Sequence, residues 1–348
     1  MTLSFTDILE KISRYEDLEN TEASHAIRLI LKGEVSNEEI SAFLMGMRMK
    51  KPAISELTAF VKEMRRVAIP VEVNIKNAVD LCGTGGDKSG TFNISTAAMF
   101  VTAGAGVPVL KHGNRSVSSK SGSYDVLEAL GAVPNLPKKA VESLYNETGM
   151  AFMFAPNFHP ALKYVMPARR ALKVRTFFNM LGPLLNPADV KRQVIGTFNA
   201  EAAEKMIQIL ENLNTNHVVT LHSDDGLDEV SLSADTVIYE YSAGSPLKKI
   251  RFNPDSLGYN LVDLSELYGG SADENARMIK TVLQGSSTKA QRKIVELNAA
   301  FAIYVSGISD SLTDAVTRAS KSIDTGEAMK KLELFVVESK KLGDMVNA

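Results

Sequence analysis

The sequence of 348 residues contains a single cysteine, Cys82, and carries almost no net charge. One cysteine excludes a disulfide within the chain and is typical of a protein from a reducing compartment. The formal net charge of −2 argues against bulk electrostatic binding to nucleic acid. No apolar run is long enough to cross a bilayer, and the first residues lack the basic and apolar regions of a signal peptide. We therefore expect a cytoplasmic protein.

Several familiar catalytic motifs are also missing. The five histidines show no paired ligand spacing, so zinc is not expected. A serine hydrolase is poorly supported, because the sequence has no Gly-x-Ser-x-Gly elbow. The glycine-rich segment 83–86 fits neither common nucleotide-binding motif. Lys88 stands where the dinucleotide fingerprint needs glycine, and Asp87 stands where a Walker loop needs glycine before Lys-Ser.

What the chain does contain is a loop rich in glycine and hydroxyl groups between an apolar strand and a helix, within residues 80–96. Glycines let the backbone turn sharply and bring its N–H groups close to a ligand. The start of the following helix adds unpaired N–H groups and the positive end of the helix dipole. A second polar segment, 111–123, brings cations and five serines one strand later. A bare turn would not need such a partner, so we predict a phosphate site.

The first seventy residues have helical periodicity. Ser36-Asn37-Glu38-Glu39 has the form of a capping box, and Ser55 can cap the next helix. Two apolar stripes follow at helical spacing: Ile40, Phe43, Leu44, Met47 and Leu57, Phe60, Val61, Met64. Because two short helices cannot bury this much apolar surface between themselves, we expect part of the helical region to pair with a second copy.

From residue 78 onward, strands alternate with helices. A strand at 78–82, a helix at 95–103 and a strand at 107–110 form a βαβ unit, which implies a parallel sheet. Both polar loops then lie at the carboxyl edge of the strands, where open α/β sheets bind ligands. The last hundred residues have mostly helical texture. Further strands are expected at 151–154, 217–222, 236–241 and 248–252, the last two as an antiparallel addition.

The length favours about two domains. We expect a small all-helical domain at 1–72. The segment 165–190, whose pattern is that of helices and turns, is expected to pack back onto this domain. The larger domain, at 73–164 and 191–348, is expected to be α/β with a mostly parallel central sheet.

Four carboxylates, Asp224, Asp225, Asp228 and Glu229, lie within six positions after a buried strand. Taken alone, they are more typical of a solvated acidic loop. Beside phosphate-binding loops, however, carboxylates favour magnesium, which takes hard oxygen ligands shared with phosphate. Ser95, in the first turn of the phosphate-facing helix, would add a hydroxyl oxygen.

A basic cluster contains Arg169, Arg170, Lys173 and Arg175. One of these side chains, facing a site, would hold a carboxylate in a bidentate fork, whereas most of the cluster is expected to be a solvated helix face.

Two histidines and the cysteine need separate interpretation. His112 is as consistent with a ligand contact as with a structural role, because a buried imidazole is uncommon between Lys and Gly. His159 precedes a proline in a turn and is more typical of structure. Cys82 ends an apolar strand and is more typical of a small buried residue than of a nucleophile.

A series of motifs runs in order through nearly the whole chain: Gly83-Thr84-Gly85-Gly86-Asp87, Asn93-Ile94-Ser95-Thr96, Lys111-His112-Gly113-Asn114-Arg115-Ser116-Val117-Ser118-Ser119, His159-Pro160-Ala161, Arg175-Thr176-Phe177-Phe178-Asn179-Met180-Leu181-Gly182-Pro183, Asn186-Pro187 and Gly226-Leu227-Asp228-Glu229-Val230-Ser231. Each is moderately specific, and in series they are highly specific. Together they resemble the anthranilate phosphoribosyltransferase family of tryptophan biosynthesis. Two departures, Lys88 and Tyr124, bear on substrate affinity rather than on the activity itself.

The resemblance implies transfer of the phosphoribosyl group of phosphoribosyl pyrophosphate (PRPP) to anthranilate, with Mg²⁺ as cofactor. It implies a fold like that of nucleoside phosphorylases and phosphoribosyltransferases, and a homodimer formed through the helical domain. Anthranilate would be held by Gly83, His112, Asn114 and Arg169, and Mg²⁺ by Ser95, Asp228 and Glu229. PRPP would be held by Gly83, Gly86, Asp87, Thr91, Asn93, Ile94, Ser95, Thr96, Lys111, His112, Gly113, Asn114, Arg115, Ser116, Val117, Ser118, Ser119 and Ser123.

Two other functions remain open at this point. A pyrimidine-nucleoside phosphorylase shares the implied fold and also cleaves at ribose C1, but the complete second loop and Arg169 favour the transferase. A catalytically idle relative that binds nucleic acid would have a strongly basic surface and would lack the metal ligands. This chain has a net charge of −2 and contains Asp228 and Glu229.

Overall fold

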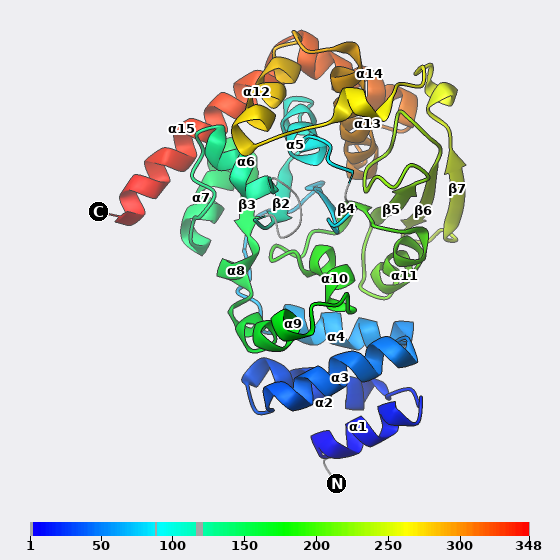
Figure 1. The fold of residues 1–348 in the computed structure, drawn as a ribbon. Helices are drawn as coiled ribbons and strands as arrows, with labels where there is room; N and C mark the ends of the chain where they lie inside the picture. The colour runs from blue at the N-terminus through cyan, green and yellow to red at the C-terminus, as the bar shows by residue number, and fades with distance from the viewer. Residues whose placement is uncertain (1–2, 88, 116–120, 348) are drawn as a thin grey trace.

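The computed structural model describes residues 3–87, 89–115 and 121–347. A small group of helices lies at one end of the molecule, at the bottom of Figure 1, and one helix from the middle of the chain returns to it. These helices are α1 (Phe5–Ser13), α2 (Asn20–Lys32), α3 (Asn37–Lys50), α4 (Ile54–Arg66) and, returning, α9 (Met166–Leu172).

The start of α3 is the predicted capping box. Ser36 Oγ accepts a hydrogen bond from the Glu39 N–H, and the Glu39 carboxylate accepts one from the Ser36 N–H. The predicted cap of α4 was wrong. That helix is capped at Ala53 rather than at Ser55, because the Glu56 carboxylate accepts the Ala53 N–H and fixes the start of the helix two residues earlier.

Both apolar stripes are buried within the chain, and none of their eight side chains is more than 2% exposed. They share one apolar cluster with α9, with α10 (Phe178–Leu181) and with α11 (Ala200–Glu211). Ile195, Val218 and Tyr239 join the same cluster from the sheet. The two helices do not bury the stripes between themselves, as expected, because α11 and one face of the sheet help to cover them.

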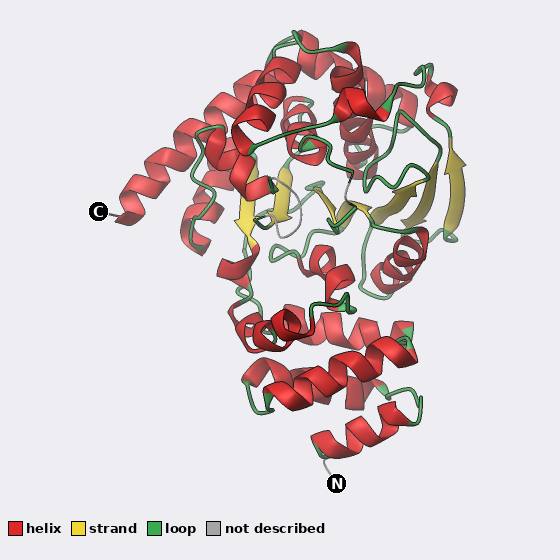
Figure 2. Ribbon diagram, viewed as in Figure 1, coloured by secondary structure: helices red, strands yellow, loops and turns green. Residues whose placement is uncertain are grey.

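The main sheet has five strands in the order β1-β4-β5-β6-β7 (Figure 2). The first three of these pair in parallel, and β6 and β7 add antiparallel strands at one edge, as expected. Two further strands, β2 and β3, pair in parallel, and a bridge between Val79 and Val109 connects them to β1. The strands are β1 (Asp80–Gly83), β2 (Val109–Gly113), β3 (Met150–Phe154), β4 (Arg192–Gly196), β5 (His217–Ser223), β6 (Thr236–Ser242) and β7 (Lys248–Phe252).

Helices cover both faces of this sheet (Figure 1). α11 packs on β5 and β6 on the side of the helical group, and α5 and α13 pack on β1, β2, β4 and β5 from the other side. Short 3-10 turns lie at η1 (Pro160–Tyr164), η2 (Gly182–Leu185), η3 (Pro254–Leu257) and η4 (Leu264–Leu267). The remaining helices are α5 (Ile94–Gly104), α6 (Ser123–Ala129), α7 (Lys138–Thr148), α8 (Ala155–Phe158), α12 (Ala272–Leu283), α13 (Lys289–Ser306), α14 (Leu312–Asp324) and α15 (Glu327–Asn347).

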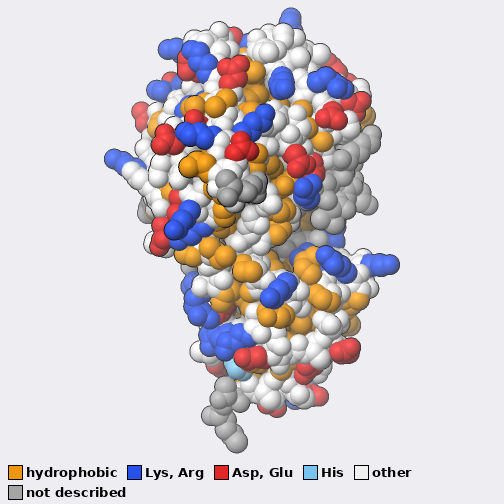
Figure 3. Space-filling view, turned by 90° about the vertical axis from the view of Figure 1, so that its left-hand side faces the viewer, with side chains coloured by type: hydrophobic (Ala, Val, Ile, Leu, Met, Phe, Trp, Pro, Cys, Tyr) orange, Lys and Arg blue, Asp and Glu red, His pale blue; other side chains and the backbone are white. Residues whose placement is uncertain are grey.

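The expected architecture of a helical part and a mostly parallel α/β part is therefore present. Figure 3 shows hydrophobic side chains gathered where the narrower helical part meets the larger part. Within the described ranges, no helix combines the length and the apolar character needed to span a bilayer. The polar loops after β1, β2 and β5 all follow the carboxyl ends of parallel strands, and this edge of the sheet holds the candidate site.

Candidate functional site

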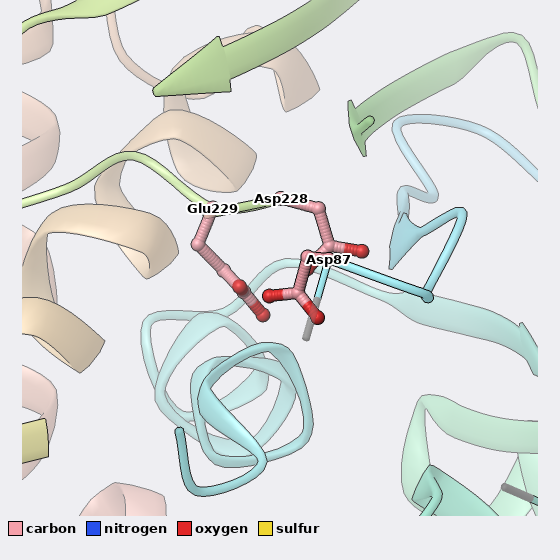
Figure 4. A group of neighbouring side chains, drawn as sticks. All are labelled: Asp87, Asp228 and Glu229. Carbon is pink, nitrogen blue, oxygen red and sulfur yellow. The ribbon is translucent and has the colours of Figure 1, made fainter. Parts of the chain in front are cut away.

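Three carboxylate groups meet beyond the ends of β1 and β5. One oxygen from each of Asp87, Asp228 and Glu229 lies within 4.8 Å of the others (Figure 4). Asp87 belongs to the glycine-rich loop after β1, and the other two belong to the loop after β5. The sequence predicted Asp228 and Glu229 as a metal-binding pair and assigned Asp87 to PRPP. The fold places the Asp87 carboxylate beside that pair.

Asp228 is buried, and Asp87 and Glu229 beside it are half-buried. Burial raises the pKa of Asp228, and the charge of Asp87 raises it further. Burial likewise raises the pKa of Glu229 well above its ordinary value, with Asp228 as the second cause. Glu229 Oε2 is buried and has no hydrogen-bond partner among the described residues. Like charges in such a site are unfavourable unless a cation binds them, and these hard oxygen ligands fit Mg²⁺. Ser95 lines the same small cavity as Asp228 and Glu229.

Glycines allow the two loops to approach one another so closely. The Gly85 N–H donates a hydrogen bond to Asp228 Oδ2 at 2.9 Å. Gly85 and Gly86 have φ values of 66° and 77°, in the left-handed region that glycine adopts without strain. A Cβ atom at Gly83 would collide with the Asp228 carboxylate, and one at Gly196 would overlap the Asp228 carbonyl oxygen.

Lys111 points into the protein from β2 and is only 2% exposed. Its Nζ donates hydrogen bonds to the Leu81 carbonyl oxygen and to Ser95 Oγ, the latter at 3.3 Å. Burial lowers the pKa of Lys111. The ammonium group therefore lies beside the first turn of α5, where it supports Ser95.

Two histidines lie together where the α/β part meets the helical part. The rings of His112 and His159 have centroids 5.3 Å apart. His159 Nε2 is 2.9 Å from the Leu185 carbonyl oxygen, whereas the buried His112 Nε2 has no partner among the described residues. Burial lowers the pKa of both imidazoles, that of His159 to about 4 and that of His112 well below its ordinary value. The structural role expected for His159 fits its contacts, and the Nε2 atom of His112 fits a ligand contact.

This burial predicts a loss of stability in acid. The unfolded chain takes up a proton at His159 near its ordinary pKa of 6.5, but the folded protein resists protonation down to about pH 4. The contribution of His159 is therefore complete above pH 6.5 and is lost between pH 6.5 and 4, by about 3 kcal/mol. Urea unfolding at several pH values should show a shallower pH dependence for His159→Gln than for the wild type. His25→Gln, a change on α2, is the control, and equal slopes for all three proteins would contradict the prediction.

The second polar loop is described on both sides of residues 116–120. Arg115 lies over the Tyr124 ring, 3.8 Å from its centroid, and Arg115 Nη1 is 3.0 Å from Asp125 Oδ1. Ser123 Oγ donates to the Asn114 carbonyl oxygen at 3.4 Å. These contacts place Gly113, Asn114, Arg115 and Ser123 at the end of β2 and the start of α6. The predicted PRPP residues Ser116, Val117, Ser118 and Ser119 lie outside the described residues.

The basic cluster divides into different environments. Arg169 is half-buried on α9, its guanidinium carbon 5.3 Å from the centroid of the Phe178 ring, and burial lowers its pKa. Arg170 and Lys173 are exposed, as expected for a solvated face. Arg175 Nη2 donates to the Gly86 carbonyl oxygen at 2.8 Å and so contacts the glycine-rich loop. The structure thus brings Arg175 to the loop after β1, whereas the described contacts of Arg169 are with Phe178 and Met166.

Sequence reasoning missed several buried polar residues that support the site. Asp80 accepts hydrogen bonds from the His112 N–H at 3.2 Å and from Asn186 Nδ2 at 2.8 Å. Asn298, on α13, bonds both the N–H and the carbonyl of Val230, next to the carboxylate pair. A buried asparagine within the apolar run of a long helix is the signal that would have pointed to this residue.

Known proteins resemble this chain in both of its parts. A family model described as the glycosyl transferase family, a/b domain, matches residues 75–329, and one described as the helical bundle domain of that family matches 6–68. An anthranilate phosphoribosyltransferase of Salinibacter ruber is 46% identical, over 96% of this chain and 98% of that protein. One of Alkaliphilus metalliredigens is 44% identical over 96% of this chain and 98% of that protein.

Solved structures show the same likeness. The crystal structure of anthranilate phosphoribosyltransferase from Thermus thermophilus matches with a TM-score of 0.89 and 36% identity, over 96% of this chain and 99% of that chain. The enzyme from Saccharomyces cerevisiae in complex with PRPP and Mg matches with a TM-score of 0.89 and 26% identity, over 97% and 98% of the two chains. Both matches cover the helical part together with the α/β part.

Proposed function

Because this chain belongs to the anthranilate phosphoribosyltransferase family, it is a glycosyltransferase of tryptophan biosynthesis, and we propose how its residues divide the work of the reaction. The enzyme transfers the 5-phosphoribosyl group of PRPP to the amine of anthranilate and releases N-(5-phosphoribosyl)anthranilate and pyrophosphate. The observation that carries the proposal is the group of three carboxylates, Asp87, Asp228 and Glu229, where the glycine-rich loop meets the loop after β5.

The reaction sets clear demands on the site. The anthranilate nitrogen forms a bond to ribose C1 as the bond from C1 to pyrophosphate breaks, and the nitrogen then loses a proton. The sugar becomes oxocarbenium-like while negative charge builds on the departing pyrophosphate. Alignment and stabilisation of the leaving group therefore matter more than a covalent nucleophile. An aromatic amine is already unprotonated at neutral pH, so no strong general base is required.

Asp228, Glu229 and Ser95 would hold Mg²⁺, with Asp87 beside them. The support is their hard oxygen ligands, their mutual repulsion and the Glu229 oxygen that has no partner among the described residues. When bound, the ion supplies positive charge to the pyrophosphate. Lys111, which hydrogen-bonds Ser95, keeps that hydroxyl at the first turn of α5.

PRPP would bind across the loops after β1 and β2. The left-handed turn at Gly85 and Gly86 and the start of α5 present backbone N–H groups, which suit phosphate oxygens. The residues assigned to PRPP are Gly83, Gly86, Asp87, Thr91, Asn93, Ile94, Ser95, Thr96, Lys111, His112, Gly113, Asn114, Arg115 and Ser123, together with Ser116, Val117, Ser118 and Ser119 beyond the described residues.

Anthranilate would lie between the α/β part and α9, held by Gly83, His112, Asn114 and Arg169. The half-buried guanidinium of Arg169 suits a carboxylate, because a fork of two N–H donors matches its two oxygens. His112 supports the assignment with its buried Nε2, which has no partner among the described residues and belongs to an imidazole that burial keeps neutral.

Arg169→Ala should raise the KM for anthranilate about ten- to a hundredfold while the KM for PRPP changes little. The reason is the loss of a charged hydrogen-bonded contact, which contributes about 1.5–3 kcal/mol. Arg170→Ala is the matched control, because this neighbour is exposed on the same helix. Steady-state kinetics with each substrate varied in turn decide the point, and equal effects on both substrates would indicate a folding role instead.

We also propose the domain division, assembly and location of the enzyme. Residues 1–72 and 165–190 would form the helical domain, and 73–164 and 191–348 the α/β domain.

The helical domain carries two exposed hydrophobic side chains, Tyr15 and Met49, which are 62% and 63% exposed and support a homodimer through this domain. Sedimentation at micromolar concentration tests this, since a fully active monomer would refute it. The single free cysteine supports a cytoplasmic enzyme.

A pyrimidine-nucleoside phosphorylase is the competing activity for such a fold, and the co-substrate distinguishes the two. Anthranilate is fluorescent, so its disappearance can be followed with PRPP and Mg²⁺ together and with either one omitted. We expect turnover only in the complete mixture. Cleavage of a nucleoside by phosphate, without anthranilate turnover, would overturn the proposed function.

A further inference from the structure

The side chain of Asn93, at the start of α5, does not cap its helix as an asparagine at this position usually does. Asn93 is the N-cap of α5, and asparagine is among the best N-cap residues because its oxygen accepts an N–H of the first turn. Asn199 behaves in this way, since its Oδ1 accepts the Ala202 N–H of α11 at 2.8 Å. Asn93 makes no such side-chain hydrogen bond to α5, all of which the structure describes.

The Asn93 amide is instead held by groups outside its helix. Asn93 Oδ1 accepts a hydrogen bond from Asn275 Nδ2 of α12 at 2.9 Å. Asn93 Nδ2 donates to the carbonyl oxygen of Ser121, at the end of the second polar loop, at 3.2 Å. The side chain therefore links α12 to that loop. Because Asn93 Oδ1 is hydrogen-bonded to Asn275, it does not accept an N–H of the first turn of α5.

The direction of these hydrogen bonds is fixed by a backbone group. The Gly270 N–H can only donate, and it donates to Asn275 Oδ1 at 2.8 Å. Asn275 must then turn its NH₂ group to Asn93, so Asn93 must turn its oxygen to Asn275 and its NH₂ group to Ser121. Asn275 is only 2% exposed, so water does not compete for these bonds.

The segment that presents Asn275 is packed tightly against the loop before α5. The Gly269 N–H donates to the Gly90 carbonyl at 2.8 Å, and the Phe92 N–H donates to the Leu267 carbonyl at 3.0 Å. A Cβ atom at Gly269 would lie 2.6 Å from both Asn275 Oδ1 and Phe92 Cα. The glycine thus lets α12 come near enough for Asn275 to reach Asn93.

We propose that Asn275 is a positioning residue for PRPP. It holds the Asn93 side chain off the first turn of α5 and so leaves the N–H groups of that turn open to phosphate oxygens. The inference rests on the proposed PRPP site, and it assigns a role to a helix that lies beyond both substrate-binding loops in the chain.

Asn275→Asp tests this with almost no change of shape. The carboxylate still accepts the Gly270 N–H but no longer donates to Asn93, whose amide is then free to turn toward α5 or away from Ser121. We expect the Kd for PRPP in the presence of Mg²⁺, measured by calorimetry without anthranilate, to rise about tenfold. The KM for anthranilate should stay near that of the wild type, whereas the melting temperature should fall, because a buried carboxylate replaces a neutral amide. Asn275→Ala, which removes both bonds, should shift PRPP affinity in the same direction.

Ser271→Ala is the control for loosening of α12. Ser271 Oγ accepts the Glu274 N–H and caps this helix, but it does not contact Asn93, so PRPP affinity should be unchanged. Wild-type PRPP affinity in the Asn275 variants overturns the inference. So does a parallel loss of affinity for both substrates that follows the fall in melting temperature, as for a purely structural residue. Failure of the wild-type protein to bind PRPP would instead overturn the proposed function.

Discussion

An enzyme carrying Asp228→Asn and Glu229→Gln together should lose at least about a hundredfold in kcat/KM and should no longer bind Mg²⁺. Charge stabilisation by a bound metal contributes several kcal/mol to such a reaction, and each 1.36 kcal/mol is about a factor of ten in rate. The amides keep the volume of the carboxylates but bind Mg²⁺ poorly. Calorimetric titration with Mg²⁺ and PRPP and the fluorescence assay measure the two losses separately.

The same variant should be no less stable than the wild type when Mg²⁺ is removed. Burial and mutual repulsion raise the pKa of both groups, so their charged forms destabilise the folded protein and amides relieve that cost. Asp224→Asn is the control in the same loop, because Asp224 is exposed and pairs with Arg251 on the surface. Wild-type turnover of the double variant at ordinary Mg²⁺ concentrations would contradict the metal assignment.

Gly196→Ala should impair the enzyme as severely, although it replaces no polar side chain. The added Cβ atom would overlap the Asp228 carbonyl oxygen, and a backbone atom cannot turn aside as a side chain can. Either β4 or the loop with the carboxylate pair must therefore shift. We expect a loss of about 1–3 kcal/mol or more in the free energy of unfolding. Displacement of Asp228 should also weaken Mg²⁺ binding and lower kcat about a hundredfold or more.

Gly182→Ala provides the stability control for this substitution. Gly182 has a helical φ of −48°, and among the described residues beyond its two chain neighbours nothing lies within 4 Å of a Cβ atom built there. Its free energy of unfolding should stay within about 0.5 kcal/mol of the wild type. Chemical denaturation and Mg²⁺ titration of both variants test the comparison. If Gly196→Ala had wild-type stability and wild-type metal affinity, the proposed role of this close contact would be wrong.

The sequence predicted which segments are helices and strands better than it predicted which strands lie next to each other in the sheet. The strands at 217–222 and 236–241 and the helical first and last segments were visible from periodicity, because their burial depends on their own residues. β4 was not predicted, since Arg192–Gly196 is short and has no alternation. It nevertheless separates β1 from β5 in the sheet. Strand order depends on pairing between distant segments, and no local pattern records it.

The same holds for the candidate site: residues that stand in a local sequence pattern were predicted, and contacts between distant segments were not. The acidic segment that contains Asp228 and Glu229 was singled out from its position after a buried strand, because parallel strands bring their carboxyl ends to one edge, and the family resemblance assigned this pair to the metal. Asp87 joins them only because the turn at Gly85 and Gly86 folds its loop back toward β5. Asn275 escaped notice because its partner, Asn93, lies 182 positions away in the chain. Contacts of this kind arise from packing and not from motifs.

The apolar cluster that includes α11 has a consequence for the evolution of this architecture. Along the chain, the helical and α/β family regions are separated by a boundary between residues 68 and 75, as two independent domains would be. In the folded protein, however, the two regions share one hydrophobic core, because Ile207 and Leu210 of α11 belong to the same buried cluster as Phe60 of α4. Replacing the helical region would expose that face of α11 to water at about 25 cal/mol per Å². The two regions must therefore change together.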